Sequence, residues 1–268
     1  MNASIKVFLM GGMGNNLFQF SRALELHKNN YDVEIIYLSK RHLFLFGIIG
    51  HTVRQDFFKI GKVLKSLDLA SREANLLDLA HLGLTFLKRK IGLSSYFNLS
   101  LEDLKKVKKK DFLDVGYFQS KEHISLESIN LVSKSLINIF KIKKKLNDNE
   151  FVLHFRATDS DPKNHPSQKD LESLVSVCVK QNKAIKVATD DRKKTIYVFQ
   201  EFNQNISFIS DDSIDDFKYL AASKNIFLSN SSYAFWAGIC AKIIRNDLNL
   251  FASKTWQYED FLSTKKFE

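Results

Sequence analysis

The stretch that most constrains the fold is a short apolar run that ends abruptly in polar residues, FVLHFRATDSDP at residues 151–162. A buried parallel strand has this pattern when it delivers polar side chains to the carboxyl edge of a sheet, where open α/β folds bind ligands. Arg156 there favours an anionic ligand, because a planar guanidinium contacts phosphate through two parallel hydrogen bonds. Taken alone, His154 and Arg156 also fit a structural role, as a satisfied histidine and a surface ion pair.

Four more apolar runs follow in the second half of the chain, and helical segments separate them. The expected strands are IKVAT, ISFIS, NIFLS and KIIR, in addition to FVLHFR at residues 151–156. Strands that alternate with helices in this way predict a parallel sheet in a Rossmann-like domain. Beyond them, we expect residues 256–264 to form a helix that packs back across the domains.

The first half opens with an apolar segment at residues 5–10, the glycine turn GGMGNN at 11–16, and apolar residues at helical spacing from 17 to 24. This order predicts a strand, a tight turn and a helix with an asparagine as N-cap, and a strand at 33–38 completes a βαβ unit. GGMGNN lacks GxGxxG spacing and a Walker lysine, so it fits dinucleotide binding and P-loop chemistry poorly. Its N–H groups could face phosphate or a sugar, or the glycines could merely permit close packing.

The length of 268 residues exceeds one typical domain of about 100 to 200 residues. Between residues 40 and 140, amphipathic segments with basic faces predict helices, and DFLDVGYF predicts a strand. The highly charged run KIKKKLNDNE at 141–150 is expected to connect two domains. We therefore expect an N-terminal α/β domain at 1–145, a Rossmann-like domain at 146–250 and the C-terminal helix within 251–268.

A net charge of +10 and a pI near 9.4 favour anionic partners such as nucleotides, nucleic acid or an acidic membrane surface. We expect no nucleic-acid partner, because the lysine runs lack interleaved aromatic residues on which bases could stack. Cys178 and Cys240 are too few for a disulfide framework or a zinc site, which indicates a reducing compartment.

No signal peptide is visible, and the longest apolar run, at 43–50, is far shorter than the roughly 20 residues that span a bilayer. We expect a cytoplasmic protein. The basic helices between residues 59 and 110, together with that apolar run, have two interpretations. They dock peripherally on the anionic inner membrane, or they pack against the N-terminal domain.

Two further segments place polar residues at expected strand ends. In VATDD, Asp190 could accept hydrogen bonds from N1–H and the exocyclic amine of guanine, and Asp191 could cap the next helix. A metal-binding aspartate pair is the remaining option. In NSSYAFW, Asn230, Ser231 and Ser232 precede a helix, so they could bind phosphate oxygens or simply cap that helix.

In this order, the segments resemble the α-1,2-fucosyltransferase family of bacterial surface-polysaccharide enzymes. GGMGNNLFQFSRA resembles the opening GGLGNQLFQYA of that family, and GYFQS stands intact at residues 116–120. HFRATD is similar to HxRRGD, and NSSYAFW is similar to NSTFSWW. Asn16, Ala157 and Ala234 depart from the family pattern, which has glutamine, arginine and serine there, so the chain resembles a divergent member.

The resemblance implies an α/β, GT-B-like fold of two Rossmann-like domains facing a cleft, with the acceptor on the N-terminal side and the nucleotide sugar on the C-terminal side. It implies an inverting, metal-independent transfer of fucose from GDP-fucose to a galactoside hydroxyl of a glycan such as an O-antigen or capsule, without a cofactor. The acceptor is free or lipid-linked. The residues implied in donor binding are Gly12, Asn15, Asn16, His154, Arg156, Asp190, Ser231 and Ser232.

The implied catalytic residues are Arg156, which would stabilise the leaving diphosphate, and Asp159, which would act as the base or orient Arg156. Three other interpretations are kept open. Another GDP-sugar or linkage would use the same fold. A nucleic-acid-binding protein would account for the charge, and a dehydrogenase would account for the glycine turn.

Overall fold

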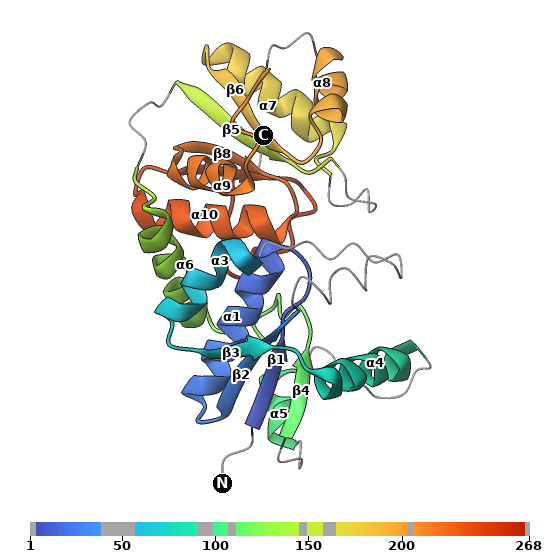
Figure 1. Cartoon of the computed structure of the whole chain (residues 1–268). Helices are drawn as coiled ribbons and strands as arrows, with labels where there is room; N and C mark the ends of the chain where they lie inside the picture. Colours follow the sequence, from blue (N-terminus) through green and yellow to red (C-terminus); the bar gives the residue numbers. More distant parts are fainter. Residues whose placement is uncertain are drawn as a thin grey trace. The chain divides into compact units, whose positions relative to one another are not determined.

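The computed structural model describes residues 4–38, 57–90, 99–106, 111–144, 149–157, 165–202 and 206–265. The chain divides into two compact units, Met1–Ser135 and Leu136–Glu268, and each is built around one parallel sheet (Figure 1). The division falls within helix α6 (Leu126–Phe140), and residue 145, near which the sequence predicts the boundary, lies outside the described residues.

The N-terminal unit contains the four-stranded sheet, in the order β3-β2-β1-β4. Its elements before α6 are β1 (Ser4–Phe8), α1 (Met13–Lys28), β2 (Asp32–Tyr37), α3 (Phe57–Ser66), β3 (Ala70–Glu73), α4 (Leu76–Lys90), α5 (Leu101–Lys106) and β4 (Asp111–Val115). The predicted βαβ unit is confirmed, since β1 and β2 pair in parallel on either side of α1 in the sequence. Strand β3 was not expected, because its mostly exposed ASRE sequence lacks an apolar run.

Helix α1 begins earlier than the sequence predicts. Its N-cap is Gly12, in an extended conformation, and Asn15 and Asn16 lie in the first turn. The prediction of an asparagine N-cap is therefore wrong. The reason is local: Gly11 has a φ of +76°, a left-handed conformation that turns the chain into the helix and that favours glycine.

The C-terminal unit contains the five-stranded parallel sheet, in the order β7-β6-β5-β8-β9. Its elements are β5 (Glu150–Phe155), α7 (Gln168–Lys180), β6 (Ala184–Thr189), α8 (Arg192–Gln200), β7 (Ile206–Phe208), α9 (Ser213–Ala222), β8 (Asn225–Leu228), α10 (Ser232–Ile244) and β9 (Asn249–Ala252). The expected alternation is confirmed, but KIIR is not the fifth strand. Its residues 242–244 end α10, because no turn residue precedes them, and the strand forms after the Asn246–Asp247 turn.

The C-terminal segment is not the helix expected over residues 256–264. Its residues form turns, and Lys265 pairs with Phe251 in a parallel bridge. Trp256 and Tyr258 are both buried. In a helix, side chains two residues apart point to nearly opposite sides, so a helix on the surface would not bury both. Tyr258 instead packs on Phe235 of α10, with a distance of 4.9 Å between ring centroids.

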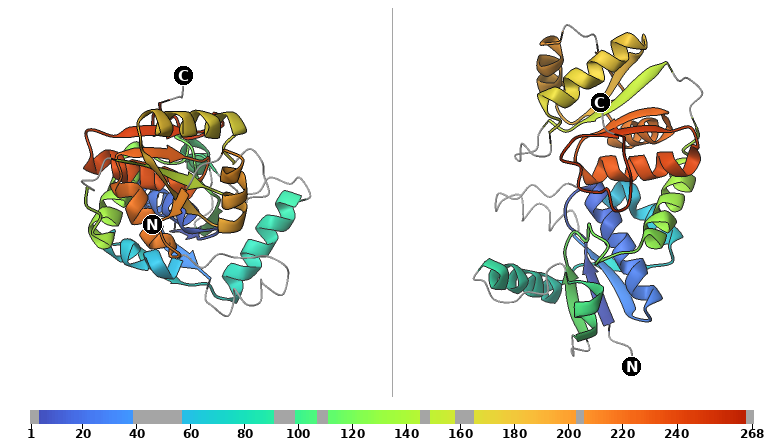
Figure 2. Two further views of the ribbon diagram at one scale, coloured as in Figure 1. Left: turned by 90° about the horizontal axis from the view of Figure 1, so that it is seen from above. Right: turned by 180° about the vertical axis from the view of Figure 1, so that it is seen from behind.

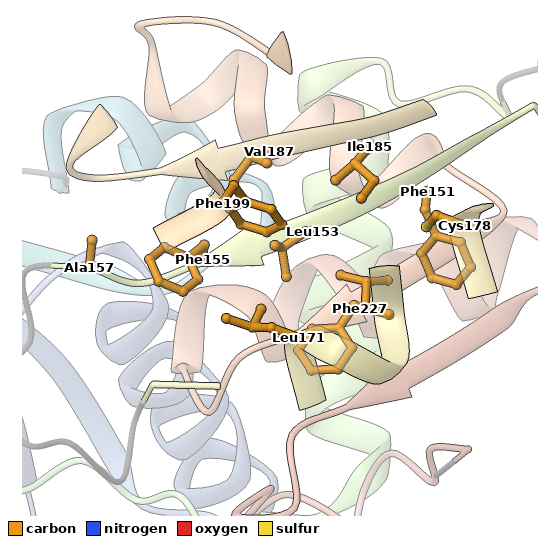
Figure 3. Close-up of a cluster of buried hydrophobic side chains, with 11 residues drawn as sticks. Phe151, Leu153, Phe155, Ala157, Leu171, Cys178, Ile185, Val187, Phe199 and Phe227 are labelled. Atoms are coloured by element: carbon orange, nitrogen blue, oxygen red, sulfur yellow. The ribbon is translucent and has the colours of Figure 1, made fainter. Parts of the chain in front are cut away.

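The core of the C-terminal unit surrounds β5, whose six residues are all buried. Phe151, Leu153 and Phe155 point to one face of the sheet, where they pack against α7 and α8 (Figure 3). Because side chains alternate along a strand, His154 falls on the other face. This packing fixes the end of β5 and therefore the position of the residues that follow it.

Candidate functional site

Three neighbouring strands of the C-terminal sheet end together. The register pairs His154 of β5 with Ala188 of β6 on one side and with Leu228 of β8 on the other. The residues that follow these strands therefore meet at one carboxyl edge. Arg156, after β5, is hydrogen-bonded to Ser231, after β8. Asp190, after β6, is hydrogen-bonded to Ala157, after β5.

His154 lies in a closed environment, with 8% of its surface exposed. Its Nδ1 is 2.6 Å from Oγ of Ser229, and its ring centroid is 5.2 Å from that of Tyr233. Burial, assisted by the positive charge of Arg156, lowers the pKa of His154 to about 4, although Asp190 acts in the opposite direction. The imidazole is therefore neutral near pH 7, and it can offer a hydrogen bond without a charge.

Arg156 extends toward the beginning of α10. Its Nη1 donates to Oγ of Ser231 over 3.4 Å, and Ser231 is the N-cap residue of α10 but makes no side-chain hydrogen bond to that helix. A helix N-terminus carries partial positive charge, so a guanidinium beside it concentrates charge of one sign. An anion bound between them would relieve that repulsion.

The two aspartates after β6 have different roles. Asp191 accepts a hydrogen bond from the Lys194 N–H at 3.0 Å, so the prediction that it caps α8 is confirmed. The exposed Asp190 accepts from the Ala157 N–H at 2.7 Å, which ties the end of β6 to the end of β5. Lys194, which the sequence analysis missed, donates through Nζ to the Ala157 carbonyl at 2.7 Å. The only sequence signal for Lys194 is its position, as a basic residue in the first turn after the helix cap Asp191.

The positions that depart from the family pattern are buried. The side chain of Ala157 belongs to the hydrophobic cluster of the C-terminal unit, and Ala234 is fully buried in α10. Asn230 accepts a hydrogen bond from the Gln257 N–H at 3.3 Å, which is a structural contact. Ser232, the first residue of α10, is half-buried. Asp159 lies outside the described residues, so its role stays a prediction.

In the N-terminal unit, the asparagines of the glycine turn contact their own chain. Asn16 is 2% exposed, and its Nδ2 donates to the Met10 carbonyl and to Oε1 of Gln19, both at 3.1 Å. Asn15 accepts from Nε2 of Gln119 at 2.9 Å. Gln19 and Gln119 were not singled out in the sequence, although both lie in segments that resemble the family.

A second contact joins the same two segments. Nε of Arg22 lies 2.9 Å from Oδ2 of Asp114, and both side chains are fully buried. Arg22 also donates to the carbonyls of His123 and Leu99, and its guanidinium lies 5.0 Å from the Phe118 ring centroid. The polar residues of this unit thus hold the segments after β1 and β4 together.

Across the described part of the chain, His, Cys, Asp and Glu side chains do not gather in groups of three or more that could hold a metal ion. None of the described helices has the length and apolar character needed to cross a bilayer.

No protein-family model matches the sequence, and no curated protein matches it either. Solved structures do. A mutant of FUT1 from Arabidopsis thaliana in complex with GDP has a TM-score of 0.53 and 10% identity, over 99% of this chain and 75% of that one. NodZ α-1,6-fucosyltransferase soaked with GDP-fucose has a TM-score of 0.48 and 10% identity, over 90% and 93%. E. coli heptosyltransferase WaaC with ADP has a TM-score of 0.42 and 10% identity, over 98% and 91%.

At this identity the likeness concerns the fold alone, and the FUT1 structure carries it. Together with the two parallel sheets, it shows that the chain has an α/β, GT-B-like fold of two Rossmann-like domains.

Proposed function

We propose that the protein is a glycosyltransferase that moves fucose from GDP-fucose to a galactoside hydroxyl of a bacterial surface glycan, with an α-1,2 linkage. The observation that carries the proposal is the position of Arg156 beside the N-terminus of α10, where an anionic diphosphate would offset two neighbouring positive groups. The sequence resemblance supplies the sugar and the linkage. The GT-B-like fold supports a nucleotide-sugar donor.

In the proposed reaction, the bond between C1 of the sugar and the β-phosphate oxygen breaks as the acceptor hydroxyl attacks from the opposite face. The sugar then gains oxocarbenium character, the acceptor hydroxyl gives its proton to the base, for which Asp159 is the candidate, and the diphosphate gains negative charge. Arg156 and the first turn of α10 stabilise that charge without a divalent cation. Such a stabiliser is typically worth about 3 to 4 kcal/mol.

Recognition of the nucleotide base falls to Asp190 and His154. The carboxylate of Asp190 is oriented by the Ala157 N–H, and it could accept from N1–H and the exocyclic amine of guanine. Adenine and the pyrimidines do not offer that pair of donors. Neutral His154, held against Ser229 and Tyr233, contributes shape without adding charge.

The first experiment is a calorimetric titration with GDP, ADP and UDP. We expect GDP to bind without added metal and in the presence of a chelator, and ADP and UDP to bind at least about tenfold more weakly. In Asp190→Asn, the preference for GDP should fall by about 1 to 3 kcal/mol, because the amide replaces one acceptor with a donor. Equal binding of the three nucleotides would contradict the proposal.

The second experiment measures turnover. Arg156→Ala should lose about 10² to 10³ in kcat, and Arg156→Lys should recover little of it, because an ammonium lacks the planar fork. Lys218→Ala, which removes an exposed cation of the same unit, serves as the control and should keep full activity. Near-wild-type turnover of Arg156→Ala would remove Arg156 from the mechanism.

The base and the donor sugar need separate tests. If Asp159 is the base, Asp159→Asn should lose the acidic limb of the pH–rate profile, whereas an orienting role would lower the rate at every pH. Another GDP-sugar or linkage in the same fold is the second candidate. Turnover of a panel of GDP-sugars distinguishes it, since only GDP-fucose should be consumed under the first proposal.

A further inference from the structure

Helix α4 of the N-terminal unit exposes four leucines on one face. Leu76, Leu77, Leu84 and Leu87 are 83, 71, 52 and 54% exposed. At 3.6 residues per turn, these positions fall within about 100° around the helix axis. The opposite face carries Leu82, which is buried in a hydrophobic cluster with β4. The helix therefore has one apolar face packed in the unit and a second one outside it.

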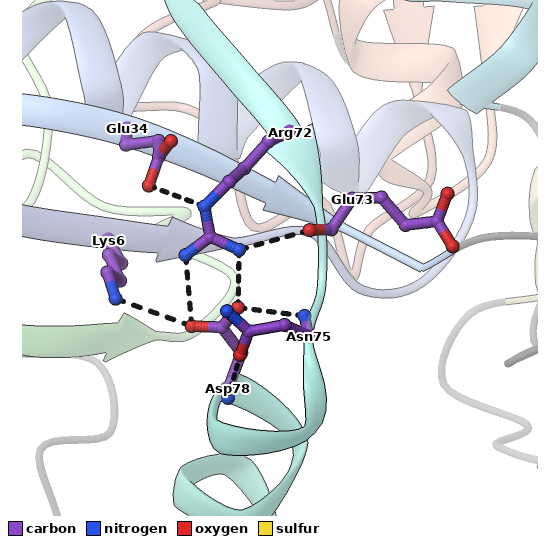
Figure 4. Close-up of polar contacts among 6 residues, drawn as sticks. All are labelled: Lys6, Glu34, Arg72, Glu73, Asn75 and Asp78. Atoms are coloured by element: carbon purple, nitrogen blue, oxygen red, sulfur yellow. Dashed lines mark hydrogen bonds and ion pairs between the residues drawn. The ribbon is translucent and has the colours of Figure 1, made fainter.

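The exposure of these leucines is not a consequence of a loosely held helix (Figure 4). Asp78, in the first turn of α4, accepts from Arg72 at 2.6 and 3.2 Å and lies 3.5 Å from Nζ of Lys6. Asp78 and Asn75 also exchange hydrogen bonds between side chain and backbone, each at 3.0 Å. Burial alone would raise the pKa of Asp78, but the hydrogen bonds from Arg72 and Asn75 lower it to about 2. This network fixes the first turn of α4 to the sheet, and the helix extends away from it (Figure 2).

The sequence around this face is strongly basic. Residues 57–110 contain twelve lysines and arginines against five aspartates and glutamates, and α4 ends in the residues Lys88, Arg89 and Lys90. Most of the net charge of +10 therefore lies in one fifth of the chain. A second copy would bring the same positive charge to the face, whereas an anionic surface would be attracted to it.

We propose that the exposed face of α4 docks on an anionic lipid surface. The four leucines enter the boundary between headgroups and acyl chains, and lysines and arginines of the basic segment 57–110 contact the lipid phosphates. This surface lies in a different unit from Arg156, so its role is independent of the proposed transfer reaction.

Vesicle flotation of the full-length protein tests the proposal. Wild type should float with vesicles that mix phosphatidylglycerol and phosphatidylcholine, far less with phosphatidylcholine alone, and progressively less as salt is added. The double variant Leu84→Ser, Leu87→Ser should partition at least about tenfold more weakly, because burial of each leucine is lost. The matched control is Leu126→Ser, Leu131→Ser, which removes two exposed leucines of α6 and should float like wild type.

GDP binding by the leucine variants provides a second readout. We expect their affinity for GDP to be unchanged, which would show that the variants are folded. Wild-type flotation of the α4 double variant would overturn the proposal, as would equal flotation with neutral and anionic vesicles. Self-association of the wild type without lipid, abolished by the same double variant, would assign the face to a second copy and would also overturn it.

Discussion

The two sheets place polar residues at the same kind of edge, but they use them differently. In the N-terminal unit, Asn16 and Arg22 are buried, and their hydrogen bonds run to their own chain. In the C-terminal unit, Asp190 is exposed, and Arg156 is half-buried with a long contact of 3.4 Å to Ser231. A polar residue that follows a strand can therefore stabilise the fold or face a ligand. Burial of the side chain distinguishes the two, since Asn16 and Arg22 are enclosed by their partners whereas Asp190 is exposed.

The buried ion pair gives the largest predicted effect on stability. Arg22→Ala leaves the carboxylate of Asp114 buried without its partner, so the free energy of unfolding should fall by about 3 to 5 kcal/mol. Urea denaturation measures this loss. Lys218→Ala breaks an exposed pair and should cost no more than about 0.5 kcal/mol. Similar losses of unfolding free energy in the two variants would show that the buried polar contacts of the N-terminal unit contribute no more to stability than an exposed ion pair.

In the C-terminal unit, the matching test is the pH dependence of the unfolding free energy that is due to His154. Because its folded pKa of about 4 lies below the ordinary value near 6.5, the native state binds fewer protons than the unfolded state between these values. The stability that depends on neutral His154 is complete above pH 6.5 and is lost as the pH falls toward 4, by about 3 kcal/mol. We expect His154→Gln to remove this part of the pH dependence of the unfolding free energy.

The control for this measurement is His27→Gln, which changes an exposed histidine of α1. If His154→Gln also kept the full wild-type slope, the histidine would be charged in the folded protein near pH 5. The assignment of His154 as a neutral group that contacts the nucleotide base would then be wrong.

The smallest predicted effect concerns Asn16. Asn16→Ala leaves Gln19 and the Met10 carbonyl with fewer partners, so the unfolding free energy should fall by about 1 to 3 kcal/mol while the affinity for GDP stays unchanged. Chemical denaturation and calorimetry on the same sample separate the two quantities. Loss of GDP affinity at full stability would show that this edge also binds the donor, as the family resemblance implies.

Elements with local signals were predicted well. Strand β5 follows from its apolar run. The start of α8 follows from Asp191, which caps the helix by accepting a hydrogen bond from the N–H three residues later. Strand β3 and the C-terminal segment were missed or assigned wrongly. The first exists through its pairing with β2, and the second through contacts of Tyr258 and Phe261 with Phe235. Neither set of contacts leaves a periodic pattern.

The candidate site shows the same division. The sequence alone placed His154, Arg156, Asp190 and Ser231 at or just after the ends of strands that could be neighbours, and register then brings them to one edge. It did not indicate Lys194, because a lysine in a helix is normally a solvated side chain. Its bond to the Ala157 carbonyl joins residues 37 positions apart.

The alternation of strands and helices in the C-terminal unit, the α/β fold class and the polar residues that follow β5, β6 and β8 were fixed by local chemistry: apolar periodicity, glycine turns and helix caps act within a few residues. Only the tertiary structure decided which of those polar residues bond to the protein itself. Gln19 donates to the Gly116 carbonyl 97 residues later in the chain, and this contact ties α1 to the segment after β4. No such partner can be inferred from spacing, because a hydrogen bond depends on atoms meeting in space.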